Sequence, residues 1–303
     1  MSRFYLNVVL VSFVFIFFSC KKNENVNANS ESFLTGKATI YVDETITPIV
    51  EDEVLVFESN YDANFTLVSK SESEVLNALF NKKAKIVIIA RDLTKKELNV
   101  FDQMKIVPKI TKFATDGIAF VSKKSSTDTL IALKEVIGFL KGDKSFKIKG
   151  LVFDNSNSST VRYMNDLAGT NVLNAKNVYS YNTNNEVLKF VSENDGMIGV
   201  VGVNWLSQPQ PSMLPFISKI NVLSVKGLTK EGFFAPSQNN FAEGTYPLLR
   251  DLYIVNCQGA TGLGMGLATF VAGDVGQRIV LKSGLLPQKI PTRSLNIKHG
   301  KSK

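Results

Sequence analysis

Hydrophobic and polar positions alternate along the chain with the periods of buried strands and amphipathic helices. The runs at 38–42 and 85–90 are short and apolar, as expected for strands that helices cover on both faces. The segments after the strands carry apolar residues at helical spacing. Two of these segments begin with the Ser/Thr-x-x-Glu pattern of a capping box, at Ser71 and Thr94. Residues 38–103 therefore predict the order β-α-β-α-β-α.

The same alternation continues almost to the C-terminus. Between 105 and 121 the pattern predicts two extended stretches joined by a turn at Thr115-Asp116-Gly117, and the proline cluster in 204–219 predicts a loop. Strands are also expected at 65–68, 151–153, 197–201 and 249–255, and helices at 48–57, 129–139, 159–168, 184–193, 263–272 and 275–283. The predicted fold class is α/β.

The first residues of the chain have a different pattern. The apolar run at 6–18, taken as a helix, is about 20 Å long, which is too short for a hydrocarbon core of about 30 Å. It is typical of the central region of a signal peptide, and the small residue before Cys20 makes its end resemble a bacterial lipobox. We predict a signal peptide over 1–19, lipidation of Cys20, and a polar tether over 20–36. A conventional signal peptide, or a disulfide from Cys20 to Cys257, is the alternative.

Composition narrows the classes of function. The 303 residues include 35 Lys+Arg and 27 Asp+Glu, and the net charge of +8 favours acidic partners such as small anions, lipid headgroups or nucleic acid without selecting one of them. Two cysteines exclude a disulfide scaffold and a cysteine-rich zinc site, and the only histidine, His299, lies in the C-terminal tail. We therefore expect no catalytic triad, no metal site and no cofactor.

Three polar loops follow predicted strands. Residues 154–160, DNSNSST, lead from a strand into a helix, where free backbone N–H groups and the helix dipole favour an anion. The loops at Asp43-Glu44-Thr45 and at Arg91-Asp92 occupy the same topological position. Each loop alone is also consistent with a helix cap or a solvated turn. Because ligands gather at the carboxyl ends of parallel strands, the three together favour a ligand site.

Several motifs occur in a characteristic order. They are ATDGIAFV at 114–121, NSST at 157–160, GMIGVVG at 196–202, YPLLRDLYI at 246–254, and a C-terminal helix and exit at 270–287. In this order they resemble the phosphate-binding proteins that serve phosphate ABC transporters, within the type II periplasmic binding-protein fold. The NSST stretch lies where that family has Gly-Ser-Gly-Thr, its main phosphate loop.

The resemblance implies two lobes that are joined by two crossings and close on an anion. Lobe 1 is expected at 37–114 and 246–297, and lobe 2 at 115–245. The implied function is that of a non-enzymatic, monomeric lipoprotein of the periplasm or cell surface. It captures inorganic phosphate or a related oxyanion for an ABC permease, with no part for nucleic acid. A sensor or interaction lipoprotein with the same fold is the alternative.

The resemblance also implies the residues that contact the anion. These are Asp43, Glu44, Thr45, Ser69, Ser71, Arg91, Asp92, Asn157, Ser158, Ser159 and Thr160. Asp92 falls near the cleft aspartate of the family, and its carboxylate can accept the proton that phosphate keeps and sulfate lacks. The chain departs from the family at Asp154, where an arginine is usual. Arg91 or Arg162 is expected to supply the missing charge.

A glycine-rich stretch offers a competing, enzymatic interpretation. Residues 259–266, GATGLGMG, follow the predicted strand 249–255 and open a helix, as a dinucleotide pyrophosphate site does. The spacing is GxGxG rather than GxGxxG, and no βαβ unit follows to supply a carboxylate for the ribose. Tight packing between the strand and the helix explains the glycines better.

Overall fold

The computed structural model describes residues 32–125, 127–144 and 147–292. The predicted signal peptide, Cys20 and most of the predicted tether lie outside the described residues. Among the helices in the described ranges, none has the length and apolar character needed to cross a membrane.

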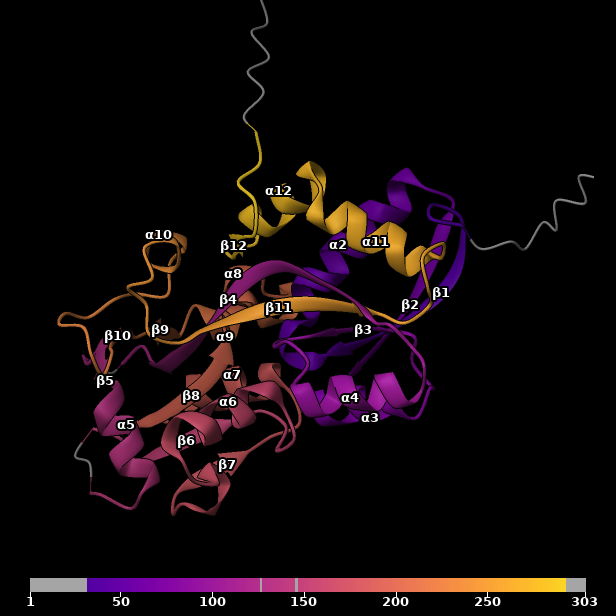
Figure 1. Cartoon of the computed structure of the whole chain (residues 1–303). Helices are drawn as coiled ribbons and strands as arrows, with labels where there is room; N and C mark the ends of the chain where they lie inside the picture. The colour runs from indigo at the N-terminus through magenta and orange to yellow at the C-terminus, as the bar shows by residue number, and fades with distance from the viewer. Residues whose placement is uncertain (1–31, 126, 145–146, 293–303) are drawn as a thin grey trace, which may run out of the picture. The chain divides into compact units, whose positions relative to one another are not determined.

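The first lobe is a mixed sheet with helices on both faces (Figure 1). Its strand order is β2-β1-β3-β11-β4, in which β1, β2 and β3 are parallel and β11 runs antiparallel to both of its neighbours. The strands are β1 (Gly36–Asp43), β2 (Ala63–Lys70), β3 (Ile86–Ile89), β4 (Lys109–Lys123) and β11 (Leu249–Asn256). One face carries α2 (Thr47–Asn60), α11 (Leu263–Ala272) and α12 (Asp274–Lys282), and the other carries α3 (Glu72–Phe80) and α4 (Lys95–Gln103).

Strand β3 shows why an almost wholly apolar run is needed here. Ile86 and Ile88 pack in the hydrophobic cluster with α2 and α11, whereas Val87 and Ile89 pack in the cluster with α3 and α4. Successive side chains of a strand point to opposite faces, so a sheet covered on both faces needs apolar residues at every position. The predicted strand is confirmed, as are the capping boxes that begin α3 and α4.

The second lobe is built on the same long strand. The second half of β4 pairs with β8 and β9, and β8 continues the sheet through β6 to β7. Its main strands and helices are β6 (Gly150–Phe153), β7 (Val178–Ser180), β8 (Met197–Gly202), β9 (Ile220–Val222), α5 (Leu133–Leu140), α6 (Ser159–Ala168) and α7 (Asn184–Glu193). Shorter elements are β5 (Leu130–Ala132), β10 (Ser224–Lys226), α8 (Asn204–Ser207), α9 (Leu214–Ile217), α10 (Gln238–Ala242) and β12 (Leu286–Pro287).

Three local predictions are wrong, one of them at the start of the helix predicted at 129–139, where Leu130–Ala132 form the strand β5 and the helix begins at Leu133. The segment predicted as a turn at 115–117 is the middle of the continuous strand β4, because β11 and β8 offer ladder partners on either side of this point. The segment 204–219 is not a loop throughout, since it forms α8, a 3-10 turn at Pro211–Met213, and α9. Pro211 and Pro215 lie in the first turns of helical segments, where their missing N–H groups leave no helix hydrogen bond unmade.

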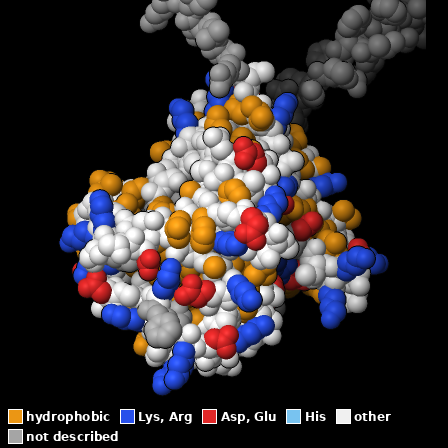
Figure 2. Space-filling model, turned by 90° about the vertical axis from the view of Figure 1, so that its left-hand side faces the viewer, with side chains coloured by type: hydrophobic (Ala, Val, Ile, Leu, Met, Phe, Trp, Pro, Cys, Tyr) orange, Lys and Arg blue, Asp and Glu red, His pale blue; other side chains and the backbone are white. Residues whose placement is uncertain are grey.

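Positive charge is dispersed on the face of the molecule that Figure 2 presents. Lys and Arg side chains are interspersed there with Asp and Glu and with small hydrophobic areas. The net charge of +8 therefore forms no continuous basic patch on this face, the feature that typically marks a nucleic-acid surface.

Candidate functional site

Two of the three predicted polar loops meet where the lobes face each other. Asp43 ends β1 and caps the 3-10 turn Glu44–Ile46, which carries Thr45. Ser158 caps α6, which begins with Ser159. The hydroxyl oxygens of Thr45 and Ser159 are 2.8 Å apart, and both residues are fully buried. Two loops separated by more than a hundred residues are thereby joined by a direct hydrogen bond.

The cation at this meeting point is Arg250, which projects from β11. Its Nη1 donates to Thr45 Oγ1 at 3.0 Å and to Ser159 Oγ at 2.9 Å, so it contacts both lobes. Its Nη2 and Nε donate to Asp116 Oδ2 at 2.7 and 3.0 Å. The register of β4 and β11 places Arg250 directly opposite Asp116. The guanidinium is thus fixed by one carboxylate and directed at two hydroxyl groups.

Three further carboxyl groups surround this centre. Asp43 Oδ2 accepts from Thr45 Oγ1 at 3.0 Å, and Asp154 Oδ1 accepts from Ser158 Oγ at 2.6 Å. The third carboxyl group is that of Glu44, which the side chain of Asn184, at the start of α7, links to Asp154. Asn184 Nδ2 donates to Glu44 Oε2 at 2.7 Å and to Asp154 Oδ2 at 3.1 Å.

Burial raises the pKa of all three carboxyl groups toward neutral values. It raises the pKa of Asp43 to about 6, with Glu72 adding to the effect and Arg250 opposing it. Burial raises the pKa of Asp154 to about 7, although the hydrogen bond from Ser158 acts in the opposite direction. It raises the pKa of Glu44 to about 8, and the negative charge of Asp154 adds to this effect. Transfer of a carboxylate from water into a buried site penalises the charged form. The site can therefore exchange protons between pH 6 and 8.

Arg250 remains charged in the same surroundings. Burial alone would lower the pKa of its guanidinium, but Asp116 and Asp43 outweigh burial and the pKa is raised. The neighbouring phenol of Tyr246 is buried and its pKa is well above the usual range, because of burial first and Asp116 second. One permanent cation therefore lies among acids that can gain or lose protons.

Several of the other predicted ligands make different contacts. Ser69 Oγ is 2.8 Å from Thr47 Oγ1, and Ser71 forms the capping box of α3 with Glu74. Asp92 is exposed, and its Oδ1 accepts from the backbone of Leu93. Asn157 is exposed, and its amide N–H donates to Asn155 Oδ1. None of these contacts joins the cluster around Arg250.

The two arginines expected from the sequence to supply the charge make other contacts in the structure. Arg91 forms two hydrogen bonds with Glu97, at 2.8 and 2.7 Å, and also contacts Glu72. Arg162 donates to the same Glu72, at 2.5 and 3.2 Å. The arginine that bonds to the hydroxyl groups of Thr45 and Ser159 is Arg250.

Further contacts cross between the lobes around this centre. Trp205, from lobe 2, donates its indole N–H to the carbonyl oxygen of Thr45 at 3.0 Å. Asn184 N donates to Glu44 Oε1, Ser73 N donates to Asn157 O, and Arg162 pairs with Glu72. The polar centre is therefore enclosed by direct contacts from both lobes.

Sequence analysis did not select Arg250, Asp116 or Asn184. A signal was present for the first two, because each is a charged residue in a segment that is mostly apolar and predicts a strand. Charges are rarely buried unless they are paired, so two such residues predict each other as partners. Asn184 gave no such signal, since an asparagine at a helix start has an ordinary explanation as part of the cap.

Two glycines of the glycine-rich stretch, in the first turn of α11, serve close packing. A Cβ atom on Gly264 would lie 2.8 Å from Asn256 Oδ1, and one on Gly266 would collide with the backbone of Phe33. The glycines therefore let the helix approach its neighbours, as the packing interpretation predicts.

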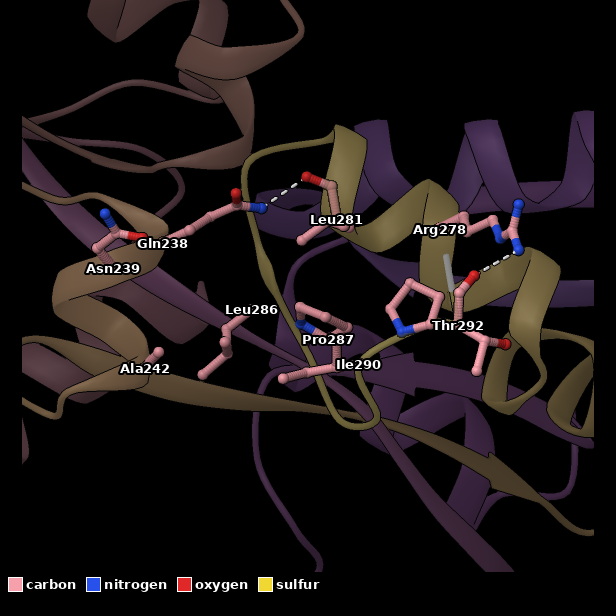
Figure 3. Close-up of a pocket in the computed structure, with 10 residues that line it drawn as sticks. Gln238, Asn239, Ala242, Arg278, Leu281, Leu286, Pro287, Ile290 and Thr292 are labelled. Atoms are coloured by element: carbon pink, nitrogen blue, oxygen red, sulfur yellow. Dashed lines mark hydrogen bonds between the residues drawn. The ribbon is translucent and has the colours of Figure 1, made fainter. Parts of the chain in front are cut away.

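A cavity lies away from this centre, between α10 and the segment formed by α12 and β12 (Figure 3). It has a volume of about 680 Å³ and a largely apolar lining. Arg278 is the charged residue in its lining, and its guanidinium is engaged by Thr292 O and Asp274. The cavity thus offers little to hold a small oxyanion.

Comparison with known proteins shows the family to which the chain belongs. The family model described as the PBP superfamily domain matches residues 27–275, and the chain belongs to this superfamily. A more particular likeness is to the phosphate-binding protein PstS of Borreliella burgdorferi, which is 25% identical over 289 residues, covering 89% of this chain and 94% of PstS.

Solved structures extend this likeness. The putative phosphate ABC transporter substrate-binding protein of Clostridium perfringens, with bound phosphate, has a TM-score of 0.70 at 18% identity, covering 84% of this chain and 100% of that one. An ABC-type phosphate transport receptor from Vibrio cholerae has a TM-score of 0.61 at 16% identity, covering 83% and 100%. The resemblance found in the sequence and the two-lobed type II periplasmic binding-protein fold are confirmed.

Proposed function

We propose that the protein is an extracytoplasmic, monomeric solute-binding protein that captures inorganic phosphate, or a related oxyanion, for an ABC transporter. One observation carries the proposal, the buried guanidinium of Arg250 that bonds to hydroxyl groups of both lobes. Relatives that are themselves phosphate-binding proteins of transporters support it.

Binding in such a site needs only non-covalent contacts. An oxyanion that enters between Thr45 and Ser159 would replace their mutual hydrogen bond and accept from both hydroxyls and from Arg250. Thr160 adds a further donor, because its buried Oγ1 has no partner among the described residues. The N-terminus of α6 contributes its dipole. These contacts bind and orient an anion without catalysing a reaction on it.

The lobes are proposed to move about the two crossings, with lobe 1 at 37–114 and 246–297 and lobe 2 at 115–245. The hydrophobic clusters support this division on β4, where Phe113 belongs to the cluster of the first lobe and Ile118 to that of the second. On β11 the change comes between Leu249 and Leu252. A hinge in β4 and β11 would let ligand binding close the lobes.

Calorimetry with phosphate, sulfate and arsenate on the chain without residues 1–20 tests this function. We expect binding of phosphate, and we expect Ser159→Ala and Thr160→Ala each to weaken it by about 1–3 kcal/mol through the loss of a hydrogen bond to a charged ligand. Ser237→Ala is the control, because this residue caps α10 and takes no part in the contacts around Arg250. If none of the three anions binds, the proposed function is wrong.

A lipid anchor on Cys20 is proposed from the lipobox-like sequence alone. Replacing Cys20 by Ser should move the protein from the membrane fraction to the soluble fraction. Cys257→Ser should leave it on the membrane, because burial raises the pKa of this thiol to about 11 and keeps it protonated and unreactive. Continued membrane attachment of the Cys20 variant would contradict lipidation.

A further inference from the structure

The polar centre contains more acid than one anion-binding arginine requires. Arg250 is paired with Asp116, whereas Asp43, Glu44 and Asp154 form no ion pair with any lysine or arginine that the structure describes. The other titratable groups that act on this centre are Glu72 and Arg162 from α3 and α6, and the phenols of Tyr163 and Tyr246. A bare oxyanion would enter a site with three unpaired carboxyl groups.

A second observation concerns Asn184, whose side chain is fully buried. Its Nδ2 bonds to both Glu44 and Asp154, and its Oδ1 has no hydrogen-bond partner within the described ranges. The site thus holds two carboxyl groups, bridged by the amide nitrogen of Asn184, and a buried amide oxygen without a partner among the described residues. All three groups can accept hydrogen bonds, and an ammonium group has three donors and no acceptor.

The acceptor cluster and the anion-binding cluster adjoin each other on both lobes. Glu44 directly precedes Thr45, and Ser158, which bonds to Asp154, directly precedes Ser159. The two clusters are therefore neighbours along the chain on both lobes. A small ligand that carries an oxyanion and an ammonium group would contact both of them.

We infer that this site between the lobes is selective for a zwitterionic ligand, an aminoalkyl phosphonate or phosphate ester. Its phosphoryl oxygens bond to Arg250, Thr45 and Ser159, and its ammonium group bonds to Glu44, Asp154 and Asn184. The inference rests on the proposed function, because it uses the same oxyanion site. It adds a second contact, between the ammonium group of the ligand and the carboxyl groups of Glu44 and Asp154.

The competing explanation is that the carboxyl groups take up protons when inorganic phosphate binds. Burial raises their pKa values to between about 6 and 8, so each can become neutral at moderately acid pH. The two explanations differ in pH dependence. Affinity for phosphate would fall as pH rises and the carboxyl groups ionise, whereas an ammonium group needs them ionised and binds without proton uptake.

Calorimetry distinguishes them with 2-aminoethylphosphonate, propylphosphonate and inorganic phosphate on the mature full-length chain. Propylphosphonate has a methyl group where the aminoethyl compound has its ammonium group. At pH 8 we expect 2-aminoethylphosphonate to bind at least about 10-fold more tightly, with no proton uptake in buffers of different ionisation enthalpy, since one charge-assisted contact contributes a factor of this size.

Variants of Glu44 and Asp154 test whether these residues cause the preference for 2-aminoethylphosphonate over propylphosphonate. Glu44→Gln or Asp154→Asn should reduce the 10-fold preference to less than about 3-fold without weakening propylphosphonate. Glu231→Gln, at an exposed carboxylate paired with Lys226, should leave the preference intact. If one of the site variants fails to fold, the other still gives the result.

Each outcome has one meaning. Binding of phosphate with equal affinity for the two phosphonates overturns the inference and leaves the proposed function standing. Tighter binding of phosphate with proton uptake also overturns it and supports protonated carboxyl groups. Failure of every phosphorus compound to bind a folded chain overturns both.

Discussion

Replacing Arg250 by Met should lower the free energy of unfolding by about 3–5 kcal/mol and abolish oxyanion binding. The side chain of Arg250 is 2% exposed and that of its partner Asp116 is fully buried. Removing one member of a buried pair leaves the other charge without compensation in a medium of low dielectric constant. Urea unfolding gives the change in stability, and calorimetry gives the change in affinity.

Two matched variants separate stability from binding. Arg278→Met removes an exposed ion pair with Asp274 and should cost less than about 1 kcal/mol. The double variant Arg250→Met with Asp116→Leu removes both buried charges, so it should recover much of the lost stability while still failing to bind an oxyanion. Retained affinity in the Arg250→Met protein would show that the ligand does not contact this guanidinium.

Local sequence patterns predicted much of the fold because their causes are local. Helix α6 begins and ends where its pattern places it, since Ser158 caps its first turn and Gly169 ends it in a left-handed conformation with φ of 66°. Strands β3 and β8 were found because apolar residues continue along their whole length. The order of the motifs then led to the resemblance from which the two-lobed fold was predicted.

The centre of the site depends on contacts that no local pattern contains. Asp116-Gly117 has the sequence of a turn, and only the pairing of β4 with β11 and β8 makes it a strand. Arg250 meets Asp116 across 134 positions of the chain, and Asn184 meets Glu44 across 140. The loops at 43–45 and 157–160 were selected from their positions after strands, and the structure brings them together. Their role as ligands stays a prediction.

The second large effect is expected on stability, from a carboxyl group that takes no part in the contacts around Arg250. Glu53 lies on α2, is 2% exposed, and neither of its carboxyl oxygens has a hydrogen-bond partner among the residues that the structure describes. It faces an apolar part of the first lobe that includes Ile88 and Phe113. Burial, with a smaller contribution from Asp52, raises its pKa to about 9. The folded protein therefore holds this carboxyl in its neutral form at physiological pH.

The pH dependence of stability follows from that shift. Below the unfolded pKa of 4.5, the group is protonated in both states and does not penalise folding through ionisation. As pH rises from 4.5 toward 9 the unfolded chain releases the proton and the folded chain keeps it, so the free energy of unfolding falls. The slope is at most about 1.4 kcal/mol per pH unit, and the loss by pH 8 is about 3–5 kcal/mol.

Replacing Glu53 by Met should raise the free energy of unfolding at pH 8 by about 3 kcal/mol, because the new side chain fits an apolar site and cannot ionise. Denaturant unfolding between pH 5 and 8 should show about one proton fewer released on unfolding. Glu53→Gln should remove the same proton but gain less stability, since its amide stays buried without partners. Glu51→Met, at an exposed position on the same helix, is the control and should change stability by less than about 0.5 kcal/mol. An unchanged pH slope in the Glu53→Met protein would mean that Glu53 is already ionised in the fold, which requires a compensating group that the packing around α2 does not provide.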